Sequence, residues 1–171
     1  SDRSLVGSEM CIRDRPRQRF HICRTSKIIL ATGALERNYA FANNDLPGIM
    51  TVNSARAYLN RYQLRVGRNI VISTNNDSAY ETALDLENAG AQITILDSRE
   101  QIGDLLLQQI LGRRINLYLG YAVAKAKNGL LSSSIRKIEI AVLTKDGWRH
   151  SGSLSCDCLL VSAGWSPVIH L

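Results

Sequence analysis

Two apolar runs in this chain end in small residues that could lie against a bulky cofactor. Residues 28–33 read I-I-L-A-T-G, and residues 158–165 read C-L-L-V-S-A-G-W. Glycine has no Cβ, so its backbone can touch a ligand or adopt a positive φ. Such ends are typical of buried parallel strands that stop beside a nucleotide, and tight packing alone is the alternative. The candidate contacts are Ala31, Thr32 and Gly33 in the first run, and Ala163, Gly164 and Trp165 in the second.

A second candidate site lies in the middle of the chain. The hydrophobic pattern predicts strands over 69–74 and 92–97, with a helix over 79–88 between them. Such a βαβ unit is the core of a dinucleotide-binding domain. Asp97 ends the second strand, where an acid commonly binds the ribose 2′-hydroxyl. This position predicts NAD over NADP, a preference that the nearby Arg99 weakens.

The turn of this unit lacks the glycines of the G-x-G-x-x-G motif that normally lies against a pyrophosphate. Residues 74–80 read T-N-N-D-S-A-Y instead. Asn75 and Asn76 tolerate a left-handed backbone, so the turn can form. Asp77, however, puts a carboxylate where the pyrophosphate would sit. The sequence therefore predicts a unit that keeps the fold and has lost dinucleotide binding, with Asn75, Asn76 and Asp97 as weaker candidates for cofactor contact.

Other chemistry is not visible in the sequence. There is no Ser/His/Asp set, carboxylate pair or cluster with metal-ligand spacing. We therefore predict no catalytic residue and no metal, so any redox chemistry would belong to a cofactor. The four cysteines form no C-x-x-C pair, which favours reduced thiols in a cytoplasmic protein.

Composition excludes two kinds of partner. The net charge of +6 comes mainly from the residues before position 28, and no basic helix face follows them. No apolar run reaches the ~18 residues that would predict a membrane span. We therefore expect neither a nucleic acid nor a membrane as a partner.

The elements that position the candidates predict an α/β fold. Residues 27–31 are predicted as a buried strand, and 51–63 as a helix with Ala55, Tyr58, Leu59 and Tyr62 on one face. Beyond position 112 the pattern predicts a β-meander, with a hairpin turn at Asp146-Gly147. The expected fold is a βαβ dinucleotide-binding-like domain with a β-meander, inserted in a partial FAD/NAD(P)-binding flavoprotein-type domain.

Four strings, taken in order, resemble the α subunit of heterotetrameric sarcosine oxidase. Residues 30–37 read L-A-T-G-A-L-E-R, and residues 41–50 read F-A-N-N-D-L-P-G-I-M. The third string is the glycine-free turn at 74–80, and the fourth is V-S-A-G-W-S-P-V-I-H-L at 161–171. The missing glycines are therefore expected to be a family trait.

The resemblance implies an activity and a set of partners. The family oxidatively demethylates sarcosine and passes a one-carbon unit to tetrahydrofolate. NAD is held by the α subunit, whose glycine motif lies upstream of this region, and the folate-binding part lies downstream. FAD belongs to the β subunit, and FMN lies where the two subunits meet. The resemblance thus implies a hetero-oligomeric oxidase with a small amine substrate and folate elsewhere in the complex. No family catalytic residue maps here, and the segment alone is expected to be inactive.

The same resemblance suggests a division of the chain. Residues 1–15 fit nothing that follows and are predicted to be non-native or disordered. Residues 16–50 would be the tail of a first nucleotide-binding domain, and 51–156 an inserted second, NAD(P)-binding-like domain. Residues 157–171 would be the strand that returns to the first domain.

Two alternatives to the sarcosine oxidase interpretation stay open. Opine-type oxidases and cyanide-forming glycine dehydrogenases share this middle region, so the substrate is less certain than the class. The chain could also belong to a non-catalytic nucleotide-binding scaffold that uses the fold for assembly.

Overall fold

The computed structural model describes residues 21–22, 24–129 and 132–169, and the chain divides into two units, Ser1–Ala31 and Thr32–Leu171. The segment 1–15, expected to be non-native or disordered, lies outside the described residues. The expectation of a buried strand over 27–31 is wrong, because this stretch has no strand structure and Ile29 is 92% exposed. Among the described residues no strand pairs with it, and an unpaired apolar run has no sheet in which to be buried.

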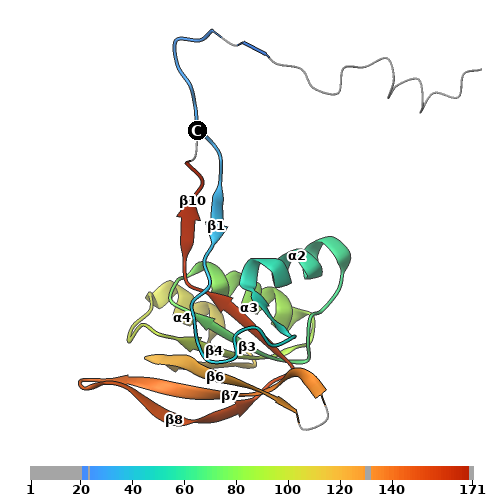
Figure 1. Ribbon diagram of the computed structural model, residues 1–171, viewed down its shortest axis with the longest axis vertical. Helices are drawn as coiled ribbons and strands as arrows, with labels where there is room; N and C mark the ends of the chain where they lie inside the picture. Colours follow the sequence, from blue (N-terminus) through green and yellow to red (C-terminus); the bar gives the residue numbers. More distant parts are fainter. Residues whose placement is uncertain (1–20, 23, 130–131, 170–171) are drawn as a thin grey trace, which may run out of the picture. The chain divides into compact units, whose positions relative to one another are not determined.

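The second unit contains a parallel five-stranded sheet. The strand order is β2-β9-β3-β4-β5, and every neighbouring pair is parallel. Its strands are β2 (Ile49–Thr51), β3 (Asn69–Thr74), β4 (Gln92–Asp97), β5 (Ile115–Leu119) and β9 (Cys158–Ser162). Three helices lie on one face of this sheet, as Figure 1 shows: α2 (Val52–Tyr62), α3 (Ser78–Asn88) and α4 (Asp104–Ile110). The predicted βαβ unit is therefore present as β3-α3-β4.

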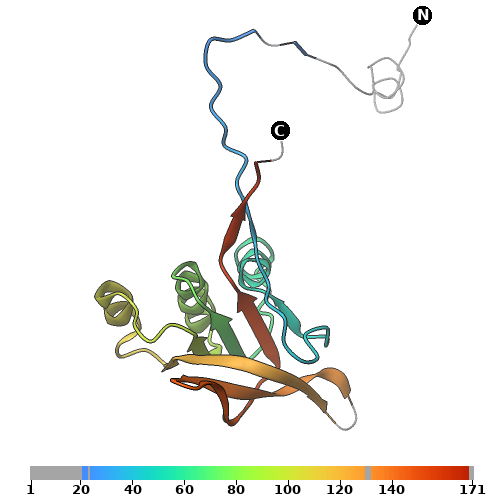
Figure 2. The same cartoon turned by 60° about the vertical axis from the view of Figure 1, so that its left-hand side comes forward.

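The opposite face of the parallel sheet is covered by an antiparallel meander, which Figure 2 shows from a second side. Its strands are β6 (Tyr121–Gly129), β7 (Ser132–Thr144) and β8 (Gly147–Ser155). The predicted hairpin turn is confirmed, since Thr144 pairs with Gly147 and Gly147 has a φ of 106°. A positive φ is easily adopted by glycine, which favours this residue at the turn.

Local sequence sets the ends of the helices. Thr51 caps α2, because its Oγ1 accepts from the backbone N–H of Ser54 at 3.3 Å. The helix ends at Gln63, which is left-handed with a φ of 55°. Of the four residues expected on one face of the helix, Ala55 is buried and Leu59 packs against the core, whereas Tyr58 and Tyr62 are exposed. The buried residues of α2 are Val52 and Ala55.

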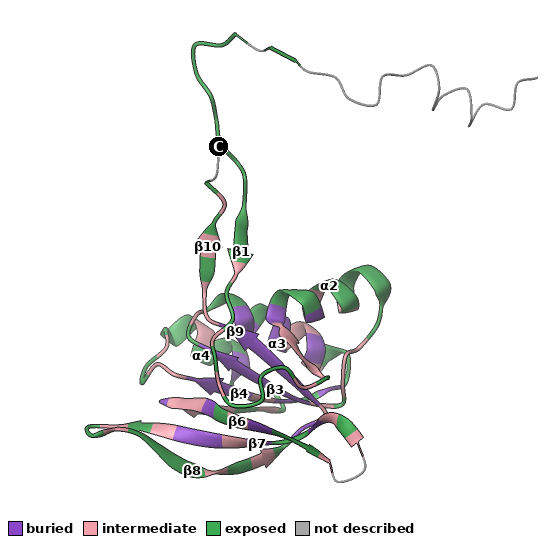
Figure 3. Cartoon of the chain, in the orientation of Figure 1, coloured by how far each residue is buried: buried purple, intermediate pink, exposed green. Residues whose placement is uncertain are grey.

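Two cores form because side chains alternate across the parallel sheet. On the helix face, Ile70 and Ile72 of β3 pack against α3 residues such as Leu86. On the meander face, Val71 packs with Leu159 of β9 and with the meander. Figure 3 shows the buried residues concentrated on β3, β4 and β9, between the two covering layers. A parallel sheet covered on both faces is the arrangement expected for an α/β domain.

The sheet includes strands at two of the expected domain boundaries. β2 begins at Ile49, just before the expected boundary at position 51, and pairs with β9. β9 (Cys158–Ser162) lies between β2 and β3 in the strand order. The reason is hydrogen bonding: β9 pairs with β3 on one side and with β2 on the other, and this sets its place in the sheet. Whether the flanking segments belong to a first nucleotide-binding domain stays a prediction.

A two-stranded ribbon continues from the end of β9. β10 (Trp165–Pro167) pairs antiparallel with β1 (Ala34–Glu36), and both strands are largely exposed. Gly33 lies at one end of this ribbon and Gly164 at the other.

Candidate functional site

The first small-residue string lies at the far end of the ribbon. The carbonyl oxygen of Gly33 accepts from the N–H of Val168 at 3.0 Å, and the Thr32 hydroxyl donates to the Val168 carbonyl. Gly33 has a φ of 76°, and no atom lies within 4 Å of the point where a Cβ would stand. The backbone is therefore left-handed and accessible, as a close cofactor contact requires. Ala31 closes the first unit and is exposed.

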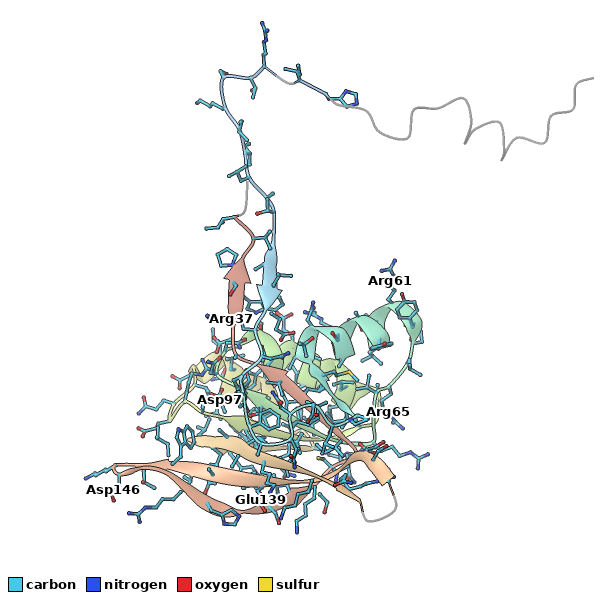
Figure 4. All side chains as sticks on the ribbon, in the orientation of Figure 1. Arg37, Arg61, Arg65, Asp97, Glu139 and Asp146 are labelled. Carbon is cyan, nitrogen blue, oxygen red and sulfur yellow. The ribbon has the colours of Figure 1, made fainter. Side chains whose placement is uncertain are left out.

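The second string lies at the near end of the ribbon. The N–H of Arg37 donates to the Gly164 carbonyl at 2.8 Å, and the Arg37 carbonyl accepts from the N–H of Ala163 at 2.8 Å. Figure 4 shows Arg37 at this foot of the ribbon. Gly164 is left-handed, with a φ of 90°. The ribbon register thus pairs Gly33 with one end and Gly164 with the other, so the structure does not bring the two strings together.

Trp165 is held over the glycine-free turn. Its Nε1 donates to the Oγ of Ser78 at 2.9 Å, and that hydroxyl donates to the Oδ1 of Asn76 at 2.6 Å. The Nδ2 of Asn76 donates in turn to the Ser162 hydroxyl at 3.1 Å. Asn75 is exposed beside these residues. These hydrogen bonds connect β9, the turn and β10.

Asp97 is enclosed at the end of β4 and is labelled in Figure 4. Its carboxylate is fully buried and accepts from the Tyr80 hydroxyl at 2.8 Å. Arg99 supplies three further donors: its backbone N–H at 2.9 Å, Nε at 3.0 Å and Nη2 at 2.7 Å. Burial and the bond to Asp97 raise the pKa of Tyr80, and the bond to Asp97 raises the pKa of Arg99. Tyr80 is therefore a neutral donor and Arg99 a permanent cation.

The turn before α3 carries a carboxylate paired with an arginine. The Asp77 carboxylate stands at the start of α3, where it makes no capping bond and pairs with the Nη1 of Arg99 at 2.7 Å. A phosphate at this place would meet the negative charge of the Asp77 carboxylate. Asp97, the acid expected to bind a ribose, already accepts hydrogen bonds from Tyr80 and Arg99. Asp77 and Asp97 are thus both paired with Arg99, and whether the turn has lost dinucleotide binding stays a prediction.

A pocket that the sequence analysis missed lies at the carboxyl ends of β3, β4 and β9. Its volume is about 400 Å³, and the lining comes from these strand ends, from the segment 39–41 and from the meander. Asn75 and Ala163, two of the candidate residues, contribute to its wall. The meander contributes small residues to this wall, Ala122, Ala124 and Ala141, and their spacing in the sequence matches no regular pattern that would have predicted a pocket.

Other kinds of site are not found among the residues that the structure describes. Within the described ranges no three His, Cys, Asp or Glu side chains gather as metal ligands would. Over the same residues, none of the helices combines the length and apolar content needed to cross a bilayer. Cys156 and Cys158 are buried free thiols.

The architecture defines a class of protein. No family model matches the chain. Solved thioredoxin reductases share the fold: the enzyme from Lactococcus lactis superposes with a TM-score of 0.61 at 17% identity, over 80% of this chain and 44% of that one. The thioredoxin reductase of T. acidophilum gives 0.62 at 12% identity, over 79% and 43%. The chain thus has the FAD/NAD(P)-binding fold of the thioredoxin reductase type, as predicted.

Among curated proteins, the chain is similar to sarcosine oxidase subunit alpha. It is 35% identical to that subunit of Corynebacterium sp. (strain U-96) over 91% of this chain, and 37% identical to that of Rhizobium meliloti over 85%. These matches cover 16% and 14% of the relatives, so the chain spans about a sixth of their length. A ferredoxin–NAD(+) reductase component from Paraburkholderia xenovorans is 29% identical over 85% of the chain. The resemblance to the sarcosine oxidase α subunit is confirmed, and the relatives are components of oxidoreductases.

Proposed function

We propose that this chain is part of an oxidoreductase subunit of the sarcosine oxidase type. The observation that carries the proposal is the 35–37% identity to sarcosine oxidase subunit alpha over most of the chain. The reaction would be the oxidative demethylation of sarcosine, and the assembled enzyme would contain further subunits. A small amine substrate and folate would bind elsewhere in the complex, and FAD and FMN would be held by or against partner subunits.

Within that enzyme, the complete subunit would hold NAD, and this segment would approach it through the small-residue strings. Gly33 supports this role, because its left-handed backbone leaves open space where a side chain would stand. Ala31 and Thr32 are proposed beside Gly33 in that contact, and Ala163, Gly164 and Trp165 are proposed as a separate cofactor contact of the second string. The β3–α3 turn would instead be structural, because Asn76, Asp77 and Asp97 are occupied by protein partners.

Replacing Gly33 by valine tests the NAD contact. The variant would be made in the intact subunit, and retained NAD would be released from the purified protein and quantified. Gly112 is the matched control, since its φ of 79° equals that of Gly33 within a few degrees and its Cβ position is also open. Both variants strain the backbone alike, so we expect NAD loss in Gly33→Val only. Equal NAD content in both would remove the proposed contact.

The closed turn also favours a second candidate, a non-catalytic scaffold built on the same fold. The two candidates differ in NAD content: an intact subunit purified without bound NAD, and unable to take it up, would support the scaffold. Opine-type oxidases and cyanide-forming glycine dehydrogenases are distinguished by substrate, through amine-dependent oxygen or dye reduction by the assembled enzyme. A cytoplasmic location is proposed on the free thiols of Cys156 and Cys158.

A further inference from the structure

One face of α2 exposes large side chains that the proposed function does not use. Tyr58, Tyr62 and Leu64 are 43%, 63% and 53% exposed, whereas Val52 and Ala55 of the same helix are buried. The two tyrosine rings lie together, with their centroids 6.2 Å apart. Exposed apolar side chains are ordinary when scattered singly, but a group of them rimmed by polar residues is typical of a surface that binds another molecule.

A groove of about 390 Å³ lies on this face of α2. It is lined by Ser54, Ala57, Tyr58, Tyr62 and Leu64. Ser54, Ala57 and Tyr58 share a side of the helix because they are three or four residues apart. The Ser54 hydroxyl is already bonded to the Thr51 hydroxyl at 2.7 Å, so the groove offers a mainly apolar surface. An apolar side chain of a partner would therefore fit it better than a small polar ligand, which needs several convergent polar groups.

The segment that forms the groove is positively charged. Residues 52–68 contain four arginines, at positions 56, 61, 65 and 68, and no aspartate or glutamate. Arg56 is neutralised by α3, because it pairs with Glu81 at 2.8 Å and with Asp85 at 3.4 Å. The two acids of α3 that face α2 are therefore already used, and the other arginines keep their charge for a partner.

Arg61 lies directly beside the groove. Its guanidinium carbon is 5.8 Å from the centroid of the Tyr62 ring, and Figure 4 shows its side chain directed away from the sheet. Among the residues that the structure describes, no carboxylate lies within ion-pair distance of Arg61. A partner that covered this cation with apolar groups would strip its hydration without compensation, so a carboxylate on the partner is required.

The residue types favour a protein chain as the partner. Tyrosine and arginine are enriched at interfaces between chains, whereas arginine is seldom buried within one chain. A nucleic acid would need open ring faces for base stacking, and Arg61 lies over the ring of Tyr62. We propose that this face of α2 docks an acidic segment of a partner subunit, with an apolar side chain in the groove and a carboxylate against Arg61. The proposal rests on the proposed function, in which the chain belongs to one subunit of a larger enzyme.

Photo-crosslinking in the assembled enzyme tests the docking surface. The photoreactive residue p-benzoylphenylalanine would replace Ala57, which is exposed and lines the groove, in the intact subunit. We expect an adduct with a partner subunit, in which the crosslinked peptide carries an aspartate or glutamate within a few residues of the attachment point. No adduct, an adduct within the same polypeptide or with a nucleic acid, or a partner peptide without acidic residues would each overturn the proposal.

Charge reversal at Arg61 tests the expected ion pair. Arg61→Glu should weaken partner binding by the intact subunit about tenfold or more, because like charges would then face each other. Arg114→Glu is the matched control, since Arg114 is also exposed and the charge change is the same, and its affinity should stay that of the wild type. Equal affinities for the two variants would overturn the ion pair.

A second pair of variants keeps the test decisive if Arg61→Glu fails to fold. Leu64→Ala removes an apolar contact of the groove without changing the charge, and it should weaken partner binding about fivefold or more. Leu105→Ala makes the same change on α4, where Leu105 is 77% exposed, and is the control. A Leu64→Ala affinity equal to that of the wild type would overturn the proposal.

Sarcosine-dependent oxygen consumption by the wild-type enzyme separates this proposal from the proposed function. An active enzyme without the adduct at position 57 would overturn the docking surface alone. An adduct with an acidic segment of a partner chain, in an assembly that does not oxidise sarcosine, would support the docking surface and overturn the proposed reaction.

Discussion

Replacing Asp97 by asparagine tests whether the end of β4 is structural. The carboxylate is fully buried and accepts hydrogen bonds from Tyr80 and Arg99. Removing one partner of a buried ion pair costs about 3–5 kcal/mol, because the other charge is left uncompensated. The Arg99 side chain is 32% exposed, so water can solvate part of the freed guanidinium. We therefore expect the lower limit, a loss of about 3 kcal/mol in the free energy of unfolding.

Urea unfolding followed by circular dichroism measures this loss. With a slope of about 2 kcal/mol per molar urea, the midpoint should fall by about 1.5 M. Asp77→Asn is the matched control, since Asp77 pairs with the same arginine at 2.7 Å but is 64% exposed. Exposed pairs contribute about 1 kcal/mol or less, so the control midpoint should move little. Adding Arg99→Gln to Asp97→Asn should cost less than the sum of the two single changes, because the unpaired charge is then gone.

The result that would refute this reasoning is equal destabilisation by Asp97→Asn and Asp77→Asn. That outcome would mean that burial of Asp97 does not make its pairing with Arg99 costly to break. A second readout separates structure from binding. If Asp97 has no ribose contact, the NAD content of the intact subunit should be the same in Asp97→Asn and in the wild type, provided both are compared under folded conditions.

Two further predictions concern stability. Burial raises the pKa of the Cys156 and Cys158 thiols to about 12. The native chain therefore keeps thiol protons that the unfolded chain loses above about pH 9. The free energy of unfolding should fall as the pH rises from about 9 to about 12. Urea midpoints across that range should fall less steeply in a Cys156→Ala/Cys158→Ala variant, and an unchanged slope would contradict the assignment. A Cβ on Gly48 would stand 2.7 Å from the Cγ2 of Ile135 at a φ of 97°, so Gly48→Ala should cost about 2–3 kcal/mol. Gly112→Ala, with a similar φ and open space, should cost about 1 kcal/mol, and equal melting temperatures for the two variants would disprove the close contact.

Sequence alone was sufficient where the physical cause is local. The strands β3 and β4 and the helix α3 follow from the spacing of their apolar residues and fall within about a residue of the expected ranges. The hairpin at Gly147 follows from the turn preference of Asp-Gly. The expectation that the β3–α3 turn has lost dinucleotide binding is equally local, because missing glycines and an added carboxylate act at the turn itself, and it stays a prediction.

Tertiary structure decided what depends on distant partners. The apolar run at 27–31 has the composition of a buried strand, but a strand forms only when another strand pairs with it. Asp97 has the sequence position of a ribose-binding acid, and the fold brings Tyr80 and Arg99 against it as hydrogen-bond donors. β9 looked like a separate return strand, and its hydrogen bonds to β2 and β3 place it inside the sheet.

The pocket at the carboxyl ends of β3, β4 and β9 shows most clearly what the sequence does not encode locally. Alanine carries almost no signal in a sequence, because a small side chain is compatible with a core, a helix or a surface. The alanines at 122, 124 and 141 become a wall only where the bulge in β6 opens the meander over the strand ends. The sequence determined the fold class and the glycine-free β3–α3 turn, since both are encoded in neighbouring residues. Packing across the sheet created the pocket, since its wall is assembled from segments that lie far apart in the chain.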